Sequence, residues 1–197
     1  MSFLEDRLRG HFEASLAAKR ATLDTALPAI ARAARLLAAR IDAGHKVLAC
    51  GNGGSAADAQ HFAAELVGRY ERERPELAAI ALTTDSSQLT AIANDYGYEQ
   101  VFAKAVRGLG RPGDLLLAIS TSGNSPSVVK AIEAAQAKGL SVIALTGKDG
   151  GAMARMLQGE DVELRAASAV TARVQEVHLL FLHCLCDALD ELLYPRP

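Results

Sequence analysis

Residues 47–55 read VLACGNGGS, a short apolar run that passes directly into a loop of small residues. The pattern returns at residues 115–125, which read LLLAISTSGNS, and in both places the chain then takes up helical periodicity. Strands that are apolar throughout and alternate with helices are typical of a parallel sheet that is covered by helices on both faces. The two stretches therefore predict an α/β fold.

The alternation of strands and helices extends over most of the chain. Apolar runs predict strands near 46–50, 78–82, 114–119, 141–145 and 161–165. Helical periodicity predicts helices near 55–67, 87–94, 98–108, 125–138, 150–157 and 171–193. We therefore expect one domain over residues 1–197, built as a parallel five-stranded sheet with flavodoxin-like layers of helices on both faces.

The first 43 residues are rich in Ala, Leu and Arg and precede the first predicted strand. A break around Pro28 predicts an N-terminal helical pair, near 4–20 and 24–42, that ends at Gly44. Such a pair has little neighbouring core of its own. It packs either on its own domain or on another subunit, and the sequence does not separate the two.

The composition excludes several classes of protein. The net charge is −2 and both signs are mixed along the chain, so we expect no basic face for nucleic acid. No uncharged run approaches the roughly 20 residues of a membrane span, and the first residues lack the order of a secretory signal. Cys50, Cys184 and Cys186 suggest no disulfide framework. We expect reduced core cysteines and a cytoplasmic location.

The two loops of small residues have the composition of an anion site. Gly, Ser, Thr and Asn at the start of a helix expose backbone N–H groups and hydroxyls at its positive end, which favours phosphate. Neither loop contains Lys or Arg, so the donors would be neutral. Both loops follow strands at the sheet edge where ligands bind. Either loop alone is equally compatible with a helix N-cap by Ser55 or Ser125, but the two together favour a small phosphorylated ligand.

Candidate acid–base groups occur on two of the predicted helices. His61 and Glu65 are four residues apart and share one helix face, where they are suited to bind a metal or to move protons. The alternative is an ordinary polar pair on a solvated face. The last helix adds Gln175, His178 and His183 among apolar residues, where a histidine is more often part of the core than a catalyst.

Two further polar positions have open interpretations. Asn94 and Asp95 precede Gly97 at the end of a predicted helix, where they either meet a ligand or form a C-cap and turn. Arg69 either complements a dianion or is a solvated charge beside the charged run 71–74.

Five sequence blocks, in order, resemble the phosphoheptose isomerase family, which belongs to the sugar isomerase (SIS) domain proteins. The blocks are CGNGGSAADAQHFAAELVGRYERERP (50–75), AIANDYGY (91–98), AISTSGNSPSVVKAI (118–132), ALTGKDGG (144–151) and RVQEVHLLFLHCLCD (173–187). The resemblance covers about residues 45–190 and is weaker in the N-terminal helices.

The resemblance implies a fold, an assembly and a reaction. The fold would be a single SIS domain with a parallel five-stranded sheet, assembled as a homotetramer. Family members convert sedoheptulose 7-phosphate to D-glycero-D-manno-heptose 7-phosphate, an early step of ADP-heptose and lipopolysaccharide core biosynthesis. The conversion moves a carbonyl from C2 to C1 by acid–base proton transfer through an enediol.

The resemblance also implies roles for particular residues. The phosphate would be held by Ser120, Thr121, Ser122 and Ser125. The sugar would be lined by Asn52, Gly53, Gly54, Asn94 and Asp95, and we add Ser55 and Arg69 to the expected substrate-binding set. Glu65 and His183 would be the acid–base pair, with Gln175 alongside. In several members one zinc ion per subunit is held by residues that match His61, Glu65, Gln175 and His183.

Glu65 is our candidate for the carbon-bound proton and His183 for ring opening and the oxygen-bound protons, although the reverse assignment remains open. A related branch of SIS proteins is not enzymatic and binds the bacterial replication initiator protein as an adaptor. This chain shares HFAA (61–64) and the tail HCLCDALDELLYP (183–195) with that branch. The branch lacks the carboxylate and the histidine at positions 65 and 183, so their presence here favours the isomerase.

Overall fold

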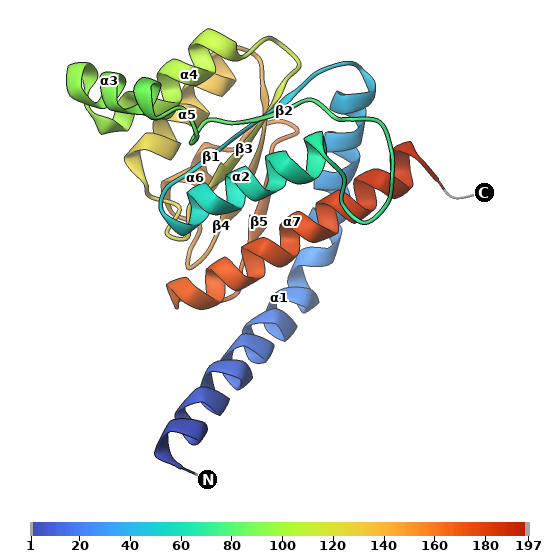
Figure 1. Cartoon of the computed structure of the whole chain (residues 1–197), viewed down its shortest axis with the longest axis vertical. Coiled ribbons are helices and arrows are strands. Elements are labelled where there is room, and N and C mark those ends of the chain that lie inside the picture. The colour runs from blue at the N-terminus through green and yellow to red at the C-terminus, as the bar shows by residue number, and fades with distance from the viewer. Residues whose placement is uncertain (1, 196–197) are drawn as a thin grey trace.

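The computed structural model describes residues 2–195, which form a five-stranded parallel sheet with helices on both faces (Figure 1). The strand order is β2-β1-β3-β4-β5. The strands are β1 (Val47–Gly51), β2 (Ala79–Ala81), β3 (Leu115–Ile119), β4 (Ser141–Thr146) and β5 (Val162–Arg165). All five predicted strands are therefore confirmed, each within two residues at either end, and so is the predicted α/β class.

Alternate side chains of each central strand enter two separate cores. In β1, Val47 and Ala49 belong to the core beneath α1 (Phe3–Asp42), α2 (Gly54–Val67) and α7 (Thr171–Leu193). Leu48 and Cys50 belong to the opposite core, beneath α4 (Val101–Leu109), α5 (Pro126–Ala137) and α6 (Gly151–Met156). A strand that is buried on both faces has no polar face, which is why these strands read as unbroken apolar runs.

The predicted helices after the first strand are also confirmed. They are α2, α4, α5, α6 and α7, given above, and α3, which spans Ser86–Tyr96. The helix expected over 98–108 begins with a short 3₁₀ turn, Tyr98–Gln100, before α4. In the described part of the chain, no helix has the length and apolar character needed to cross a membrane.

The N-terminal pair of helices was a wrong prediction, because α1 is one helix of 40 residues with Pro28 inside it. Proline in a helix removes one hydrogen bond and costs about 3 kcal/mol. Tertiary packing on both sides of the proline opposes that cost, since Ala26 and Ala33 are buried in the core with α7. The Thr22 hydroxyl also accepts a hydrogen bond of 3.0 Å from the Ala167 N–H, beyond β5.

The two halves of α1 have different surroundings. The C-terminal half packs on its own domain, through buried residues from Ala18 to Ala38. The N-terminal half projects beyond the body of the molecule (Figure 1). It is capped by Ser2 and Glu5, and it carries exposed apolar side chains: Phe3, Leu4, Leu8, Phe12 and Leu16. Packing on the chain's own domain therefore accounts for one half of the helix and leaves the other half uncovered.

Candidate active site

The two loops of small residues lie side by side at the carboxyl edge of the sheet. The strands β1 and β3 are neighbours, with Gly51 opposite Ile119 at their ends. Across the gap between the loops, the Asn52 amide donates a hydrogen bond of 2.9 Å to the hydroxyl of Ser127 in α5. The Tyr98 hydroxyl donates to the Asn52 side-chain oxygen at 2.8 Å. The predicted placement of both loops at the carboxyl edge is thus confirmed, and the structure adds that they are neighbours.

The hydroxyls of the second loop are turned toward one another. Ser120 is buried, and its hydroxyl lies 2.8 Å from that of Ser125 and 3.5 Å from that of Ser122. Ser125 stands at the N-cap position of α5, yet its side chain does not cap the helix. Ser55 lies within the first turn of α2, whose N-cap is Gly53. Capping by these serines, the alternative to a ligand site, is therefore not what the structure contains.

A close backbone approach holds the second loop in place. Gly123 has a φ of +65°, and a Cβ at this position would lie 2.0 Å from the Gly150 carbonyl oxygen. Asn124 adds a side-chain contact, since its oxygen accepts from the Ala152 N–H at 2.8 Å. The loop after β4 thus supports the loop after β3, which keeps the hydroxyls before α5 in a fixed arrangement.

The candidate acid–base residues meet on the other side of the sheet edge, between α2 and α7. His61 Nε2 lies 3.0 Å from Glu65 Oε1, on the shared helix face that their spacing predicts. His183 of α7 brings its Nε2 to 3.4 Å from His61 Nε2, and the two rings are 5.2 Å apart. The Tyr70 ring packs beside His183, with centroids 5.7 Å apart. His61, Glu65 and His183 thus come together within one chain, without a neighbouring subunit.

Gln175 and His183 link α7 to both parts of the site. A Cβ on Gly54 would lie 2.3 Å from Gln175 Nε2, so this amide covers the start of α2 beside the first loop. Eight residues separate Gln175 from His183, which corresponds to about 12 Å along the helix axis. The helix α7 therefore runs from the glycine loop to the acid–base cluster.

Residues 11–147 match the SIS domain family. A phosphoheptose isomerase of Thiobacillus denitrificans is 58% identical over 190 residues, which is 96% of each chain, and one of Shewanella sp. (strain ANA-3) is 56% identical over 191 residues, or 97% of each. The chain belongs to the phosphoheptose isomerase family. Its fold is that of phosphoheptose isomerase GmhA from Neisseria gonorrhoeae (TM-score 0.91, 51% identity, 95% of this chain and 99% of that one). A phosphoheptose isomerase from Francisella tularensis gives a TM-score of 0.93 at 46% identity, covering 97% and 100%.

The protein is therefore an isomerase, and a second carboxylate, Asp58, lies on α2 close to the acid–base cluster. Burial raises the pKa of Asp58, one turn before His61, to about 6, although the charge of His61 acts in the opposite direction. Its Oδ2 is buried without a hydrogen-bond partner. Asp58 could not be predicted from the sequence, because a carboxylate in the small-residue run SAADA (55–59) has no spacing that marks it; its burial is visible only in the structure.

The structure separates the two histidines of α7 by role. His178 is fully buried and its Nε2 lies 2.8 Å from the Thr146 carbonyl oxygen, to which it donates. Burial lowers its pKa to about 4, so the ring is neutral. His178 is thus a core residue of the isomerase that holds the end of β4, whereas His183 faces the cluster.

The remaining predicted site residues are exposed. Asn94 and Asp95 lie at the end of α3, where the Asn94 amide donates to the Asp95 carboxylate at 2.8 Å and Gly97 is the C-cap. Arg69 pairs with Glu73 at 3.0 Å and donates to the Glu71 carbonyl. Their contact with substrate stays a prediction. Tyr98 and Ser127 were not selected from the sequence, although both lie within the family blocks.

The cluster has donor atoms of the kinds that bind metals. Within residues 2–195, no three His, Cys, Asp or Glu side chains form a group with the arrangement of a metal centre. Contacts run from His61 to Glu65 and from His61 to His183. Two imidazole nitrogens and a carboxylate are nevertheless ligand types that zinc takes, so the donor chemistry fits the ion.

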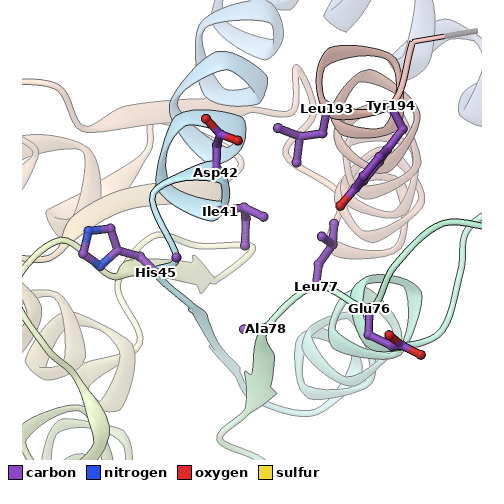
Figure 2. A pocket seen from close by; sticks show the side chains of 9 residues that line it. Ile41, Asp42, His45, Glu76, Leu77, Ala78, Leu193 and Tyr194 are labelled. Atoms are coloured by element: carbon purple, nitrogen blue, oxygen red, sulfur yellow. The ribbon is translucent and has the colours of Figure 1, made fainter.

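A cavity of about 380 Å³ opens at the opposite edge of the sheet (Figure 2). It lies where α1 and α7 end, and Ala78 and His45 in its wall precede β2 and β1. Its charged side chains do not converge, since His45 and Glu76 point away from the centre. The cavity is therefore at the amino ends of the strands, away from the loops that form the candidate active site.

Proposed function

We propose that this isomerase converts sedoheptulose 7-phosphate to D-glycero-D-manno-heptose 7-phosphate, an early step toward ADP-heptose and the lipopolysaccharide core, in the cytoplasm. The names of its close relatives support a phosphorylated heptose as substrate. The observation that carries the proposal is the contact of His61 with both Glu65 and His183, on the helix that begins at the glycine loop. A carboxylate next to two imidazoles is suited to move protons between adjacent carbons and their oxygens.

The hydroxyl loop is assigned to the phosphate. The Ser120 hydroxyl already lies within hydrogen-bond reach of those of Ser122 and Ser125, and Thr121 stands next to it in the sequence. When a phosphate oxygen arrives, these hydroxyls can turn to donate to it, and the N–H groups at the start of α5 add the positive end of a helix dipole. With the phosphate bound in this way, the other end of the sugar can extend toward the acid–base cluster.

The proton transfers are assigned to the cluster. The Glu65 carboxylate takes a proton from C1 of the open-chain ketose, which gives an enediol, and returns that proton to C2. The C2 oxygen gains a proton and the C1 oxygen loses one, so the carbonyl moves to C1. His183 carries the oxygen-bound protons, since one imidazole nitrogen can accept a proton and later donate it. His61 holds the Glu65 carboxylate in orientation through its 3.0 Å contact.

We also propose a zinc ion at this cluster, with His61, Glu65, Gln175 and His183 as ligands. When bound, zinc would polarise the oxygens of the substrate as a Lewis acid. Metal analysis of protein purified without chelators tests the assignment, and we expect about one zinc per chain. Full activity of the metal-free protein would make any bound zinc dispensable for catalysis.

A homotetramer is proposed from the uncovered half of α1. Its apolar side chains, among them Phe3 and Phe12 with exposed fractions of 83% and 75%, favour burial against other subunits. Size-exclusion chromatography with light scattering should give a mass about four times the chain mass of 20.7 kDa. A monomer at micromolar concentration would contradict the proposal.

The direct test of function is an isomerase assay with sedoheptulose 7-phosphate on the wild type beside Glu65→Gln. The amide cannot accept the carbon-bound proton, so we expect kcat to fall roughly 10²- to 10⁴-fold. Glu73→Gln, which changes an exposed glutamate paired with Arg69, is the matched control and should retain near-normal turnover. No turnover by a folded, metal-supplied wild type would favour the adaptor, which a pull-down with the replication initiator protein would then test; no observation on the described residues supports that alternative.

A further inference from the structure

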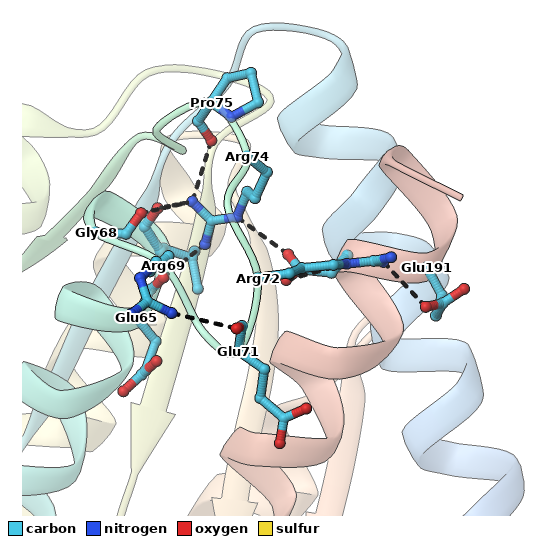
Figure 3. A network of polar contacts seen from close by, with 10 residues as sticks. Glu65, Gly68, Arg69, Glu71, Arg72, Arg74, Pro75 and Glu191 are labelled. Atoms are coloured by element: carbon cyan, nitrogen blue, oxygen red, sulfur yellow. Dashed lines mark hydrogen bonds and ion pairs between the residues drawn. The ribbon is translucent and has the colours of Figure 1, made fainter. Parts of the chain in front are cut away.

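A buried arginine joins the two helices that carry the acid–base cluster. Arg74 lies in the connection between α2 and β2, and its side chain is only 2% exposed. Figure 3 shows its guanidinium at the centre of a polar network. It donates at 2.6 Å to the Glu65 carbonyl, at 2.8 Å to that of Leu66 and at 3.1 Å to that of Gly68. On the other side its Nε donates to Asp190 of α7 at 3.1 Å.

The carbonyls that Arg74 binds belong to the last turn of α2. The final carbonyls of a helix have no partner within it, and α2 has no basic residue of its own in its last turn. A guanidinium presents several donors in a rigid plane, so it can bind several carbonyls at once while its charge complements the negative helix end. Arg74 therefore fixes the backbone at Glu65 itself.

The second partner of Arg74 fixes the other helix. Asp190 is seven residues after His183, two helical turns, so the two side chains lie on the same face of α7. Cys186 lies between them, and burial together with the charges of Glu65 and Asp190 raises the pKa of its thiol to about 12. This face of α7 is thus packed against the end of α2, with the guanidinium bridging the two.

We propose that Arg74 is a positioning residue that sets the separation between Glu65 and His183. The inference rests on the proposed function, in which these two side chains act on one substrate. A displacement of about 1 Å between reacting groups costs on the order of 100-fold in rate. The guanidinium of Arg74 binds both the Glu65 carbonyl and Asp190, which lies on the same face of α7 as His183. It therefore limits any displacement of Glu65 relative to His183.

Arg72 provides a matched control in the same segment. Its Nε lies 3.9 Å from the second Asp190 oxygen and its Nη2 3.1 Å from Glu191. Both arginines therefore face the end of α7 (Figure 3), but the hydrogen bonds to the α2 carbonyls are those of Arg74. A lysine at either position keeps the positive charge and loses the planar fork.

The experiment compares Arg74→Lys and Arg72→Lys in the full-length enzyme. We expect Arg74→Lys to lower kcat at least tenfold and to change KM less than threefold, because the phosphate loop is untouched. Arg72→Lys should change both constants less than threefold. The proposal is overturned if kcat of Arg74→Lys stays within threefold of the wild type, or if both variants lose kcat equally at equal loss of thermal stability.

If Arg74→Lys does not fold, two variants of Asp190 test the same proposal. Asp190→Ala removes the acceptor on α7, and Asp190→Asn keeps an oxygen for Nε; the asparagine variant should recover most of the kcat that the alanine variant loses. Imidazole carbon–proton NMR shifts of His61 and His183 at one fixed pH supply a readout that needs no turnover. Shifts that move in Arg74→Lys and not in Arg72→Lys support positioning even if the sugar assay fails, and unmoved shifts refute it.

Discussion

The hydroxyl loop and the acid–base cluster are built in opposite ways. The loop is six consecutive residues, 120–125, in which the Ser120 hydroxyl contacts those of Ser122 and Ser125, and its shape depends on the close backbone approach at Gly123. The cluster joins His61 to a histidine 122 residues away, on a different helix. A contiguous loop suits a group that is held alike in the ground state and the transition state, whereas side chains from two helices can be aligned for the transition state. The two regions should therefore fail differently when mutated, the first in KM and the second in kcat.

The largest effect is expected from His183→Asn. Removal of the imidazole should lower kcat roughly 10²- to 10⁴-fold, because no other group on α7 replaces it in moving oxygen-bound protons. KM should stay within about threefold of the wild-type value, since the hydroxyl loop that binds the phosphate is unchanged. Steady-state kinetics with sedoheptulose 7-phosphate measures both constants.

The control for this variant is His11→Asn, which changes an exposed histidine on the projecting half of α1. It should leave both constants unchanged. A His183→Asn enzyme with normal kcat and a raised KM would reverse the comparison and make the cluster a binding region.

A smaller effect, in the other constant, is expected from Ser120→Ala combined with Ser122→Ala. Loss of two hydroxyls that donate to a phosphate should raise KM roughly 10- to 100-fold, since hydrogen bonds to charged groups contribute about 1.5–3 kcal/mol each and water replaces part of that. The value of kcat at saturation should change little. Ser15→Ala on α1 is the control, and equal saturation curves for wild type and double variant would remove the loop from phosphate binding.

The same contrast explains what could be predicted from the sequence. The strands and the helices after the first strand follow from local patterns, because apolar runs and small-residue turns determine their own structure. The adjacency of the two loops does not, since it depends on the strand order, which places β1 beside β3. The i,i+4 pair of His61 and Glu65 follows from helix geometry. The approach of His183 to His61 does not, since it depends on how α7 packs across the sheet.

Two local rules failed where packing overrode them. Pro28 predicted a helix break, yet burial of its neighbours in the core keeps α1 continuous. The run 71–74 has the composition of a solvated segment, and Arg69 beside it does lie exposed in an ion pair. Arg74 in the same run is nevertheless buried, because the end of α2 and Asp190 together satisfy its donors. The Pro75 carbonyl, at 3.1 Å, is a fifth acceptor of Arg74. The sequence alone does not distinguish an arginine that is satisfied by such protein acceptors from one that is solvated.

The smallest expected effect concerns His178, which should affect the stability of the protein, whereas His183 should affect the rate. Burial lowers the pKa of His178 from 6.5 to about 4, so between these values the unfolded chain binds the proton that the folded chain excludes. Its contribution to stability is therefore complete above pH 6.5 and is lost as the pH falls toward 4. His178→Gln keeps a donor for the Thr146 carbonyl and does not titrate. The stability gap between wild type and this variant should narrow by about 1 kcal/mol from pH 7.5 to 5.5, as urea unfolding would measure. If the difference in unfolding free energy between the wild type and His178→Gln does not change with pH, the pKa of His178 is the same in the folded and unfolded chains. That result would contradict a neutral histidine in the core.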